Sequence, residues 1–181
     1  DADGVAYIDV TVQDDPGSNA YGFQIQIKKD GKWMTFAEAG MEVAEITNGT
    51  AYDRMSMFAP YLEEGSVAAS NDTDINPQYA KDGAPVVTYA VLVNDAADGV
   101  YDLRFNNLKV ASGDGKTMLN PGTTQGTLTI GNAVAPTDPV NPTDPVNPTE
   151  PVEGFVWDIS DAKADADGVA YIDVTVQDDP G

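Results

Sequence analysis

The strongest constraint on this chain is an exact internal repeat. Its first seventeen residues, DADGVAYIDVTVQDDPG, return letter for letter as Asp165 to Gly181. One folded sheet can use such a segment only once, so the sequence predicts a slice of a tandem array with one full repeat and the opening of the next. We therefore expect the chain to be a fragment of a longer protein.

A proline-rich stretch separates the repeat from its partial copy. Pro136 to Val152 reads PTDPVNPTDPVNPTEPV. Proline at this density supports neither a helix nor a strand ladder and favours a semi-rigid extended spacer. The alternative is that this proline-rich stretch binds in the aromatic groove of a recognition domain. The composition predicts a folded domain over residues 1–132, a Pro/Thr-rich linker over 133–153, and the first two strands of the next module over 154–181.

Charge and residue usage exclude several classes of function. Nine basic and thirty acidic residues give a net charge of −21, which argues against nucleic acid and anionic membranes as partners. The chain has neither cysteine nor histidine, so disulfides, thiolate chemistry, histidine triads and the commonest metal ligand are all excluded. We expect no enzyme, no metal site and no cofactor.

Alternation of apolar and polar residues dominates residues 1–132. Phe23, Ile25 and Ile27, for example, alternate with polar side chains, as antiparallel strands with one buried face do. About nine such strands in this length predict an all-β fold, a nine-stranded jelly-roll β-sandwich. The expected strands are 5–12, 23–28, 33–36, 66–70, 85–93, 101–105, 108–110, 116–119 and 126–130.

Two stretches interrupt this pattern. Residues 36–46, FAEAGMEVAEI, contain good helix formers, but Gly40 interrupts them, so helix and non-helix both stay open. Residues 76–81 start with Asn-Pro and end with Lys81, which predicts one short helical turn.

A further strand comes after the linker. Gly154 to Ala164 reads GFVWDISDAKA, in which Phe155, Trp157 and Ile159 alternate with other residues. This segment looks like the true first strand of a module, which the domain over 1–132 lacks. An incomplete sheet exposes unpaired backbone and an apolar slot. We therefore expect residues 155–164 to complete a sheet, either within the chain or by exchange with a neighbouring copy.

Several motifs suggest chemistry but have simpler interpretations. Residues 1–4 and 71–76 place oxygen ligands at alternate positions, as calcium loops do, yet neither completes the EF-hand pattern and solvated turns are favoured. Residues 113–117 resemble the end of a phosphate-binding loop without its upstream glycine, which favours a hairpin turn. The adjacent carboxylates Asp14-Asp15 and Glu63-Glu64 have no partner across a cleft that the sequence reveals.

The strand at 85–93 carries an unusual outer face. If Val87, Tyr89, Val91 and Val93 face the core, then Val86, Thr88, Ala90 and Leu92 face outward. An outward Leu92 beside small residues is not what solvent selects. The strand at 66–70 is flat as well, with Ala68 and Ser70 on its outer face. Either both outer faces are covered by other elements or they form a flat protein-binding surface.

These elements together resemble the cohesin module of bacterial cellulosomal scaffoldins. The order that carries the resemblance is GVAYIDVTVQDDPG, YGFQIQI, APVVTYAVLV, AADGVYDLRF and QGTLTIG, with Asp98 to Tyr101 as the acidic turn before a strand. Pro/Thr-rich linkers between near-identical tandem modules are also typical of scaffoldins.

The resemblance implies a nine-stranded jelly roll that binds dockerin domains, which carry calcium themselves, through strands 8, 3, 6 and 5. It places strand 3 at 22–28, strand 5 at 66–70, strand 6 at 86–93 and strand 8 within 108–119. The partner-binding residues it implies are Gln24, Gln26, Ala68, Ser70, Thr88, Ala90 and Leu92.

The implied function is non-catalytic docking of dockerin-bearing enzymes or scaffoldins for plant cell-wall polysaccharide degradation. The parent protein would be secreted and extracellular, free or attached to the cell surface. Two alternatives stay open: a carbohydrate-binding jelly-roll module, which needs a row of exposed aromatic rings, and an adhesin or cell-wall stalk repeat, which needs no binding face.

Overall fold

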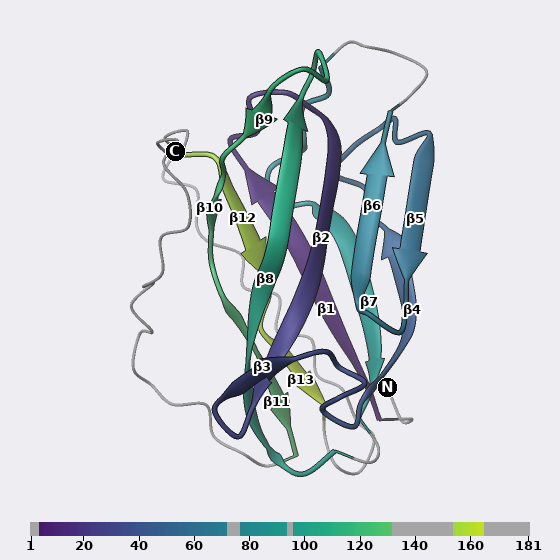
Figure 1. Cartoon of the computed structure of the whole chain (residues 1–181), viewed down its shortest axis with the longest axis vertical. Coiled ribbons are helices and arrows are strands. Elements are labelled where there is room, and N and C mark those ends of the chain that lie inside the picture. Colours follow the sequence, from purple (N-terminus) through teal and green to yellow (C-terminus); the bar gives the residue numbers. More distant parts are fainter. Residues whose placement is uncertain (1–3, 72–76, 94–95, 132–153, 165–181) are drawn as a thin grey trace, which may run out of the picture.

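The chain folds into a sandwich of two β-sheets in the computed structural model (Figure 1). The structure describes residues 4–71, 77–93, 96–131 and 154–164. Within these ranges it has thirteen strand segments and no helix. The predicted all-β sandwich is confirmed.

One sheet has five strands, drawn at the back of Figure 1. Its order is β10 (Gly122–Thr123), β12 (Val156–Ile159), β1 (Val5–Gln13), β7 (Pro85–Leu92) and β4 (Glu42–Asn48). Neighbouring strands are antiparallel, apart from the parallel contact between β10 and β12. The sheet therefore joins segments from both ends of the described chain.

The other sheet has eight strands and lies in front of the first in Figure 1. Its main path runs β13 (Ala162–Ala164), β11 (Gly126–Ile130), β8 (Gly99–Ser112), β2 (Ser18–Lys29), β6 (Ser66–Ser70) and β5 (Met57–Tyr61). Two short strands lie off this path: β3 (Lys32–Met34) pairs with β2, and β9 (Met118–Leu119) pairs with β8.

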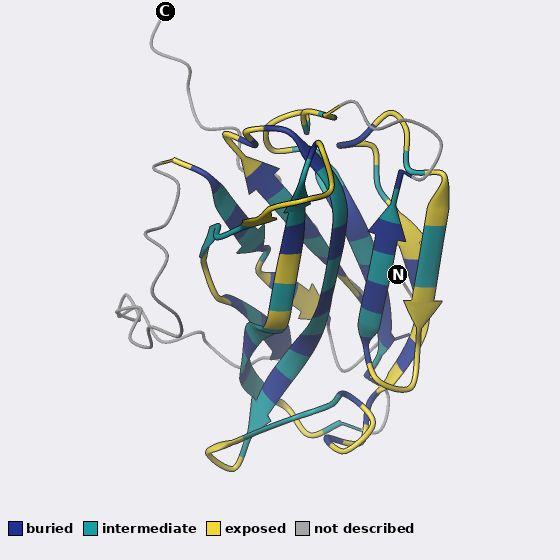
Figure 2. Ribbon diagram, turned by 45° about the horizontal axis from the view of Figure 1, so that its top comes forward, coloured by how far each residue is buried: buried dark blue, intermediate teal, exposed yellow. Residues whose placement is uncertain are grey.

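The core lies between the two sheets and matches the alternation read from the sequence. Along β2 the buried apolar residues are Tyr21, Phe23, Ile25 and Ile27, and Figure 2 shows the resulting dark and light bands on the strand. An aromatic cluster forms its centre, with the Trp157 ring 5.3 Å from Tyr21 and 5.7 Å from Phe23 between ring centroids. Such pairs add to the stabilisation that burial itself provides.

The segment after the linker belongs to both sheets. β12 runs antiparallel to β1, with Val10 opposite Ile159, and β13 runs parallel to β11, with Ile130 opposite Ala164. Phe155 and Trp157 are fully buried. The prediction that residues 155–164 complete a sheet is confirmed within one chain. The domain boundaries at 132/133 and 153/154 border residues outside the described ranges and stay a prediction.

Side chains and a glycine secure the point where this segment changes sheet. Ser160 Oγ accepts a hydrogen bond from the Asp9 backbone N–H at 2.9 Å, and Asp161 Oδ1 accepts one from the Thr127 backbone N–H at 2.8 Å. A Cβ at Gly126 would lie 2.5 Å from the Ile159 carbonyl oxygen. Only glycine therefore lets β11 approach this crossing.

The two interruptions in the pattern are not helices in the described chain. Residues 36–40 form a turn that ends at Gly40, whose φ is 84°, and β4 begins at Glu42 because Val43 and Ile46 reach the core. Within 77–81 the chain pairs Gln78 with Ser18 in an isolated bridge, so the helical turn predicted for 76–81 does not form in this part. Asn76 lies outside the described residues.

Strand boundaries also differ from the prediction. The expected strands at 101–105 and 108–110 are one strand, β8, in which Asn107 has a φ of 54° and the pairing with β2 shifts register. No strand was expected over Met57–Tyr61, where the structure has β5. This omission affects the position of the predicted site.

Candidate functional site

The seven predicted partner-binding residues do not share one face. Gln24 and Gln26 lie on β2 and Ala68 and Ser70 on β6, all in the eight-stranded sheet. The remaining three, Thr88, Ala90 and Leu92, lie on β7 in the five-stranded sheet. The expectation that strand 86–93 lies beside strand 66–70 in one binding face is therefore wrong.

Two missed strands explain this error. If residues 155–164 are counted as the first strand and the short β3 is left out, β4 is the fourth strand, β5 the fifth, β6 the sixth and β7 the seventh. The strands expected from the sequence include 33–36 as the fourth and contain neither β4 nor β5, so β6 counted as fifth and β7 as sixth. With the corrected count, strands 8, 3, 6 and 5 are β8, β2, β6 and β5, which are neighbours in the eight-stranded sheet.

The outer face of these four strands has a flat centre. Gly22 is opposite Ala68 on β6, and Ala68 is opposite Ala59 on β5. The next row along the strands places Ala20 opposite Ser70. Side chains this small leave the backbone open to a partner's close approach. We call β8-β2-β6-β5 with these outward residues the platform.

A chain of polar contacts borders the centre of the platform. Asn106 Nδ2 donates to Gln24 Oε1 at 2.7 Å, and Gln24 Nε2 donates to the Glu64 carbonyl oxygen at 2.8 Å. Further along the strands, Arg104 Nη2 donates to Gln26 Oε1 at 2.8 Å. Gln24 and Gln26 are thus held in one orientation before any partner arrives.

One aromatic ring fixes the basic side chains at the end of the platform. The turn after β2 folds Trp33 back opposite Lys28, and the Arg104 guanidinium lies 4.4 Å from the centre of the Trp33 ring. Lys28 forms an ion pair with Asp102 at 3.2 Å. Neither Trp33 nor Arg104 was among the residues expected from the sequence, although the Asp30-Gly31 turn predicts that Trp33 returns toward Lys28.

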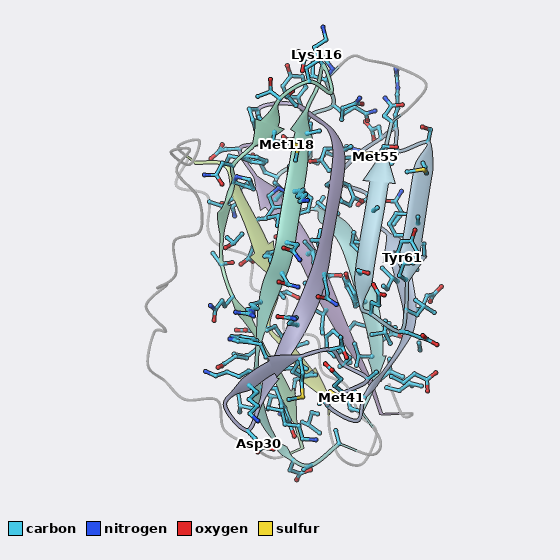
Figure 3. All side chains as sticks on the ribbon, viewed as in Figure 1. Asp30, Met41, Met55, Tyr61, Lys116 and Met118 are labelled. Atoms are coloured by element: carbon cyan, nitrogen blue, oxygen red, sulfur yellow. The ribbon has the colours of Figure 1, made fainter. Side chains whose placement is uncertain are left out.

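The platform is hollowed between β8 and β5. A shallow depression of about 480 Å³ is lined by residues that include Gly22, Gln24, Tyr61, Ala68 and Lys109. Figure 3 shows Tyr61 at the margin of the sheet, on β5, and 57% of this residue is exposed. An exposed tyrosine next to a hollow provides an apolar ring and a hydroxyl group for a partner.

The other three predicted residues lie on the opposite outer face. Thr88 Oγ1 donates to Asp9 Oδ1 at 2.6 Å, so its hydroxyl is already used. Ala90 is only 9% exposed and is paired with Tyr7 on β1. Leu92 is half-buried opposite Val5. Packing within the five-stranded sheet accounts for much of this apolar surface.

The remaining motifs show no further site in the described part of the chain. Residues 113–117 form the turn between β8 and β9, in which Ser112 Oγ and the Lys116 N–H donate to Asp114 and lower the pKa of its carboxyl. Asp15 is buried and accepts hydrogen bonds from Ser18 and Ala80, so it fixes a loop. Of the two calcium-like stretches, residues 1–3 and 72–76 lie outside the described ranges.

Neither a metal cluster nor a membrane-spanning helix is present among the described residues. In the ranges that the structure describes, no group of three or more acidic side chains is arranged to hold a metal ion. No helix in the described part of the chain has the length and apolarity to cross a membrane.

Sequence comparisons identify no relative: no family model and no curated protein matches the chain. Solved structures do match. The seventh ScaB type I cohesin from Pseudobacteroides cellulosolvens has a TM-score of 0.55 and 20% identity, and the match covers 78% of this chain and 91% of that one.

Two other structures agree with this match. A non-cellulosomal cohesin from the archaeon Archaeoglobus fulgidus has a TM-score of 0.52 at 13% identity, covering 73% of this chain and 82% of that one. A chain of the CaDoc0917–CaCohA2 complex has a TM-score of 0.53 at 14% identity, with coverages of 71% and 91%. The chain has the fold of the cohesin modules, as the sequence resemblance predicted.

Proposed function

We propose that this chain is a non-catalytic module that binds a dockerin domain through the platform. The single observation that carries the proposal is the flat small-residue centre of β8-β2-β6-β5, bordered by side chains that are already oriented. A preformed surface of this kind loses little side-chain entropy when a rigid partner binds. One of the structures with the same fold is part of a complex with a dockerin, which supports the choice of partner.

The chemistry of the platform suits a helical partner. Ala59, Ala68 and Gly22 leave room for a helix to lie across three strands, and Tyr61 and Lys109 stand at the edge of the hollow beside them. Gln24 and Asn106 can exchange hydrogen bonds with polar side chains of that helix. In this proposal the calcium belongs to the dockerin, and the platform itself needs none.

The wider biological role is part of the same proposal. A secreted scaffold with several such modules would hold several dockerin-bearing enzymes on one chain and gain avidity on plant cell-wall polysaccharide. A structure with the same fold is the seventh ScaB type I cohesin, which supports this role. The carbohydrate-binding alternative has weaker support, because the exposed Tyr7 and Tyr61 lie on different sheets and Tyr79 on a loop.

Two surface variants distinguish the two faces. Ala68→Arg places a long charged side chain at the centre of the platform, whereas Leu92→Asp adds a charge to the opposite sheet. We expect Ala68→Arg to weaken dockerin binding by roughly 100-fold or more, as the disruption of an interface centre does, and Leu92→Asp to change it less than about threefold.

Calorimetric titration with a panel of dockerins, with calcium or with chelator, measures both effects. Urea unfolding of each variant checks that the module stays folded. A loss of binding with Leu92→Asp and none with Ala68→Arg would place the site on the other sheet. Binding to cellulose by the parent chain, with no affinity for any dockerin, would favour the carbohydrate-binding alternative.

A further inference from the structure

We propose that β12 and β13 are an exchangeable element, and that the groove they fill accepts residues 155–164 of a second copy of this chain. The proposal does not depend on dockerin binding. It rests on the burial of this segment, on its pairing with other strands and on the repeated sequence directly C-terminal to it.

Burial makes the groove selective for this segment. Phe155, Trp157 and Ile159 are at most 2% exposed, and the Trp157 ring enters a pocket formed by Tyr21, Phe23 and Phe105. Without the segment, these rings and the backbone of β1 would be open to water. Because an occupant needs the same alternation of large apolar side chains, the occupant that fits is a chemically identical strand.

The contacts that hold the segment reach distant parts of the chain. The Gly122 and Thr124 N–H groups donate to the Phe155 and Trp157 carbonyl oxygens, and the Ser160 N–H donates to the Asp9 carbonyl oxygen. Further along, the Gly131 N–H donates to the Ala164 carbonyl oxygen at 2.8 Å. The same contacts form whether the segment comes from this chain or from another copy. Covalent linkage changes only the local concentration of the segment.

The sequence of β1 occurs a second time in the chain. Residues 165–181 lie outside the described ranges, and Val169 to Gln177 has the same sequence as β1. A protein in which modules repeat in this way brings several copies of residues 155–164 close to several grooves.

Chain length sets the balance between the closed and exchanged forms. The 22 residues from 132 to 153 reach roughly 70 Å when extended, and a tether of that reach gives the segment an effective concentration on the order of 1 mM. Closed monomers therefore dominate in dilute solution. Exchange between copies becomes as frequent as closure within one chain when the module concentration reaches this effective concentration. Neighbouring modules of one array can meet this condition.

Cysteine pairs test the exchange directly, because the chain has no cysteine of its own. Thr11 and Asp158 are Cα partners across β1 and β12, at a spacing that a disulfide can bridge. A Thr11→Cys chain is mixed with an Asp158→Cys chain and oxidised. We expect disulfide-linked dimers whose fraction rises with protein concentration, from about a tenth near ~0.1 mM to about half near ~1 mM.

A matched pair in the same sandwich provides the control. Ala20 and Ser70 are Cα partners on β2 and β6, which are not part of the exchange. A mixture of Ala20→Cys and Ser70→Cys chains should give few linked dimers at any of these concentrations. Equal linkage in both mixtures would reveal random oxidation and overturn the proposal. The proposal would also be overturned if a chain with both Thr11→Cys and Asp158→Cys forms its internal disulfide while the mixture of single-cysteine chains gives no linked dimers.

A second measurement tests the exchange if the disulfide between positions 11 and 158 does not form at all. A labelled peptide with the sequence of residues 154–164 is incubated with the parent chain, and native mass spectrometry records the complexes. With the peptide in excess over ~1 mM, we expect uptake of one peptide per chain, and no uptake of a peptide that carries Trp157→Ala. If neither peptide is taken up after prolonged incubation in mild urea, the groove does not exchange its strand and the proposal fails.

Discussion

Trp157 ties the C-terminal segment to the centre of the sandwich. The residue is fully buried, and its ring has three aromatic neighbours, Tyr21, Phe23 and Phe105. Its indole Nε1 has no hydrogen-bond partner in the described structure, a cost of about 1–3 kcal/mol. Burial of the large ring offsets this cost, which makes Trp157 the main packing anchor of β12.

Truncation of the Trp157 side chain should destabilise the folded module strongly. We expect Trp157→Ala to lower the free energy of unfolding by about 3–5 kcal/mol, the range for large aromatic residues in cores. Urea unfolding followed by far-UV circular dichroism measures the loss. The matched control is Val156→Ala, because Val156 is the adjacent, half-buried residue of the same strand. Similar small losses for both variants would show that β12 contributes little to the fold.

Asp158 gives the segment a dependence on pH. Burial, followed by repulsion from Asp161, raises the pKa of the Asp158 carboxyl. A carboxyl with a raised pKa in the folded state destabilises that state while it is ionised. The destabilisation is complete above the folded pKa and disappears as the pH falls below the unfolded value of 3.8.

We therefore expect Asp158→Asn to be more stable than the parent at pH 7 and no more stable near pH 3, with the hydrogen bond to Thr124 still possible. Asp53 is the control with the opposite sign, because the hydrogen bond from Lys81 lowers the pKa of its carboxyl. Asp53→Asn should be less stable than the parent at pH 7, and the difference should vanish in acid. Urea midpoints across this pH range measure both, and shifts of equal sign would contradict the assignment.

At the scale of elements, prediction from the sequence succeeded where alternation was strong and failed where it was weak. β2 and β7 carry large apolar residues at every second position, and both were predicted. β5 has the sequence MFAPY, in which Pro60 and Ala59 obscure the alternation. As an edge strand it can tolerate proline, so neither propensity nor period identified it.

The failure to predict β5 also limited the prediction of the candidate site. Gln24, Gln26, Ala68 and Ser70 were placed on the correct sheet, since their own strands were read correctly. Arg104, Asn106 and Tyr61 were missed because their place on the platform depends on which strands are neighbours. Sheet order is fixed by contacts between residues far apart in the sequence, and one sequence carries little of that information.

Close packing between β11 and the crossing from β12 to β13 gives a prediction for an element. A Cβ at Gly126 would meet the carbonyl oxygens of Ile159 and Ser160 at 2.5 and 2.7 Å, and neither backbone group can move independently. We expect Gly126→Ala to cost about 1–3 kcal/mol, as overpacking does, and to loosen β12. Urea midpoints and acrylamide quenching of tryptophan fluorescence measure the two effects.

Gly122 provides the matched control on β10. A Cβ there would lie 3.6 Å from Val156 and 3.7 Å from the Phe155 carbonyl oxygen, which are ordinary contacts. Gly122→Ala should therefore leave both the urea midpoint and the quenching close to those of the parent. If the two alanine variants behave alike, the crossing is not held by close backbone packing.

At the scale of the whole molecule, the proposed docking and exchange surfaces lie apart. In the eight-stranded sheet, β13 and β5 are the two opposite edges, and the platform extends from β8 to β5. In the five-stranded sheet, the exchangeable β12 lies between β10 and β1. A module that has exchanged its strand would therefore keep the platform open, so linked copies could still bind partners.

The length of the linker determines whether a chain can fill its own groove. Ala164 lies opposite Ile130, so the chain after Gly131 must return to Gly154, ten residues before Ala164, which is roughly 33 Å of strand at ~3.3 Å per residue. Deletion of residues 136–152 leaves five residues between these glycines, which reach only about 20 Å. We expect this variant to form dimers or larger closed assemblies with Trp157 buried, because only another copy can then supply the strand.

Light scattering after size exclusion, together with quenching of tryptophan fluorescence, tests this expectation. Replacement of the same residues by an equally long Gly/Ser segment should stay monomeric, and a monomeric deletion variant, with Trp157 buried or exposed, would contradict the exchange of strands between copies.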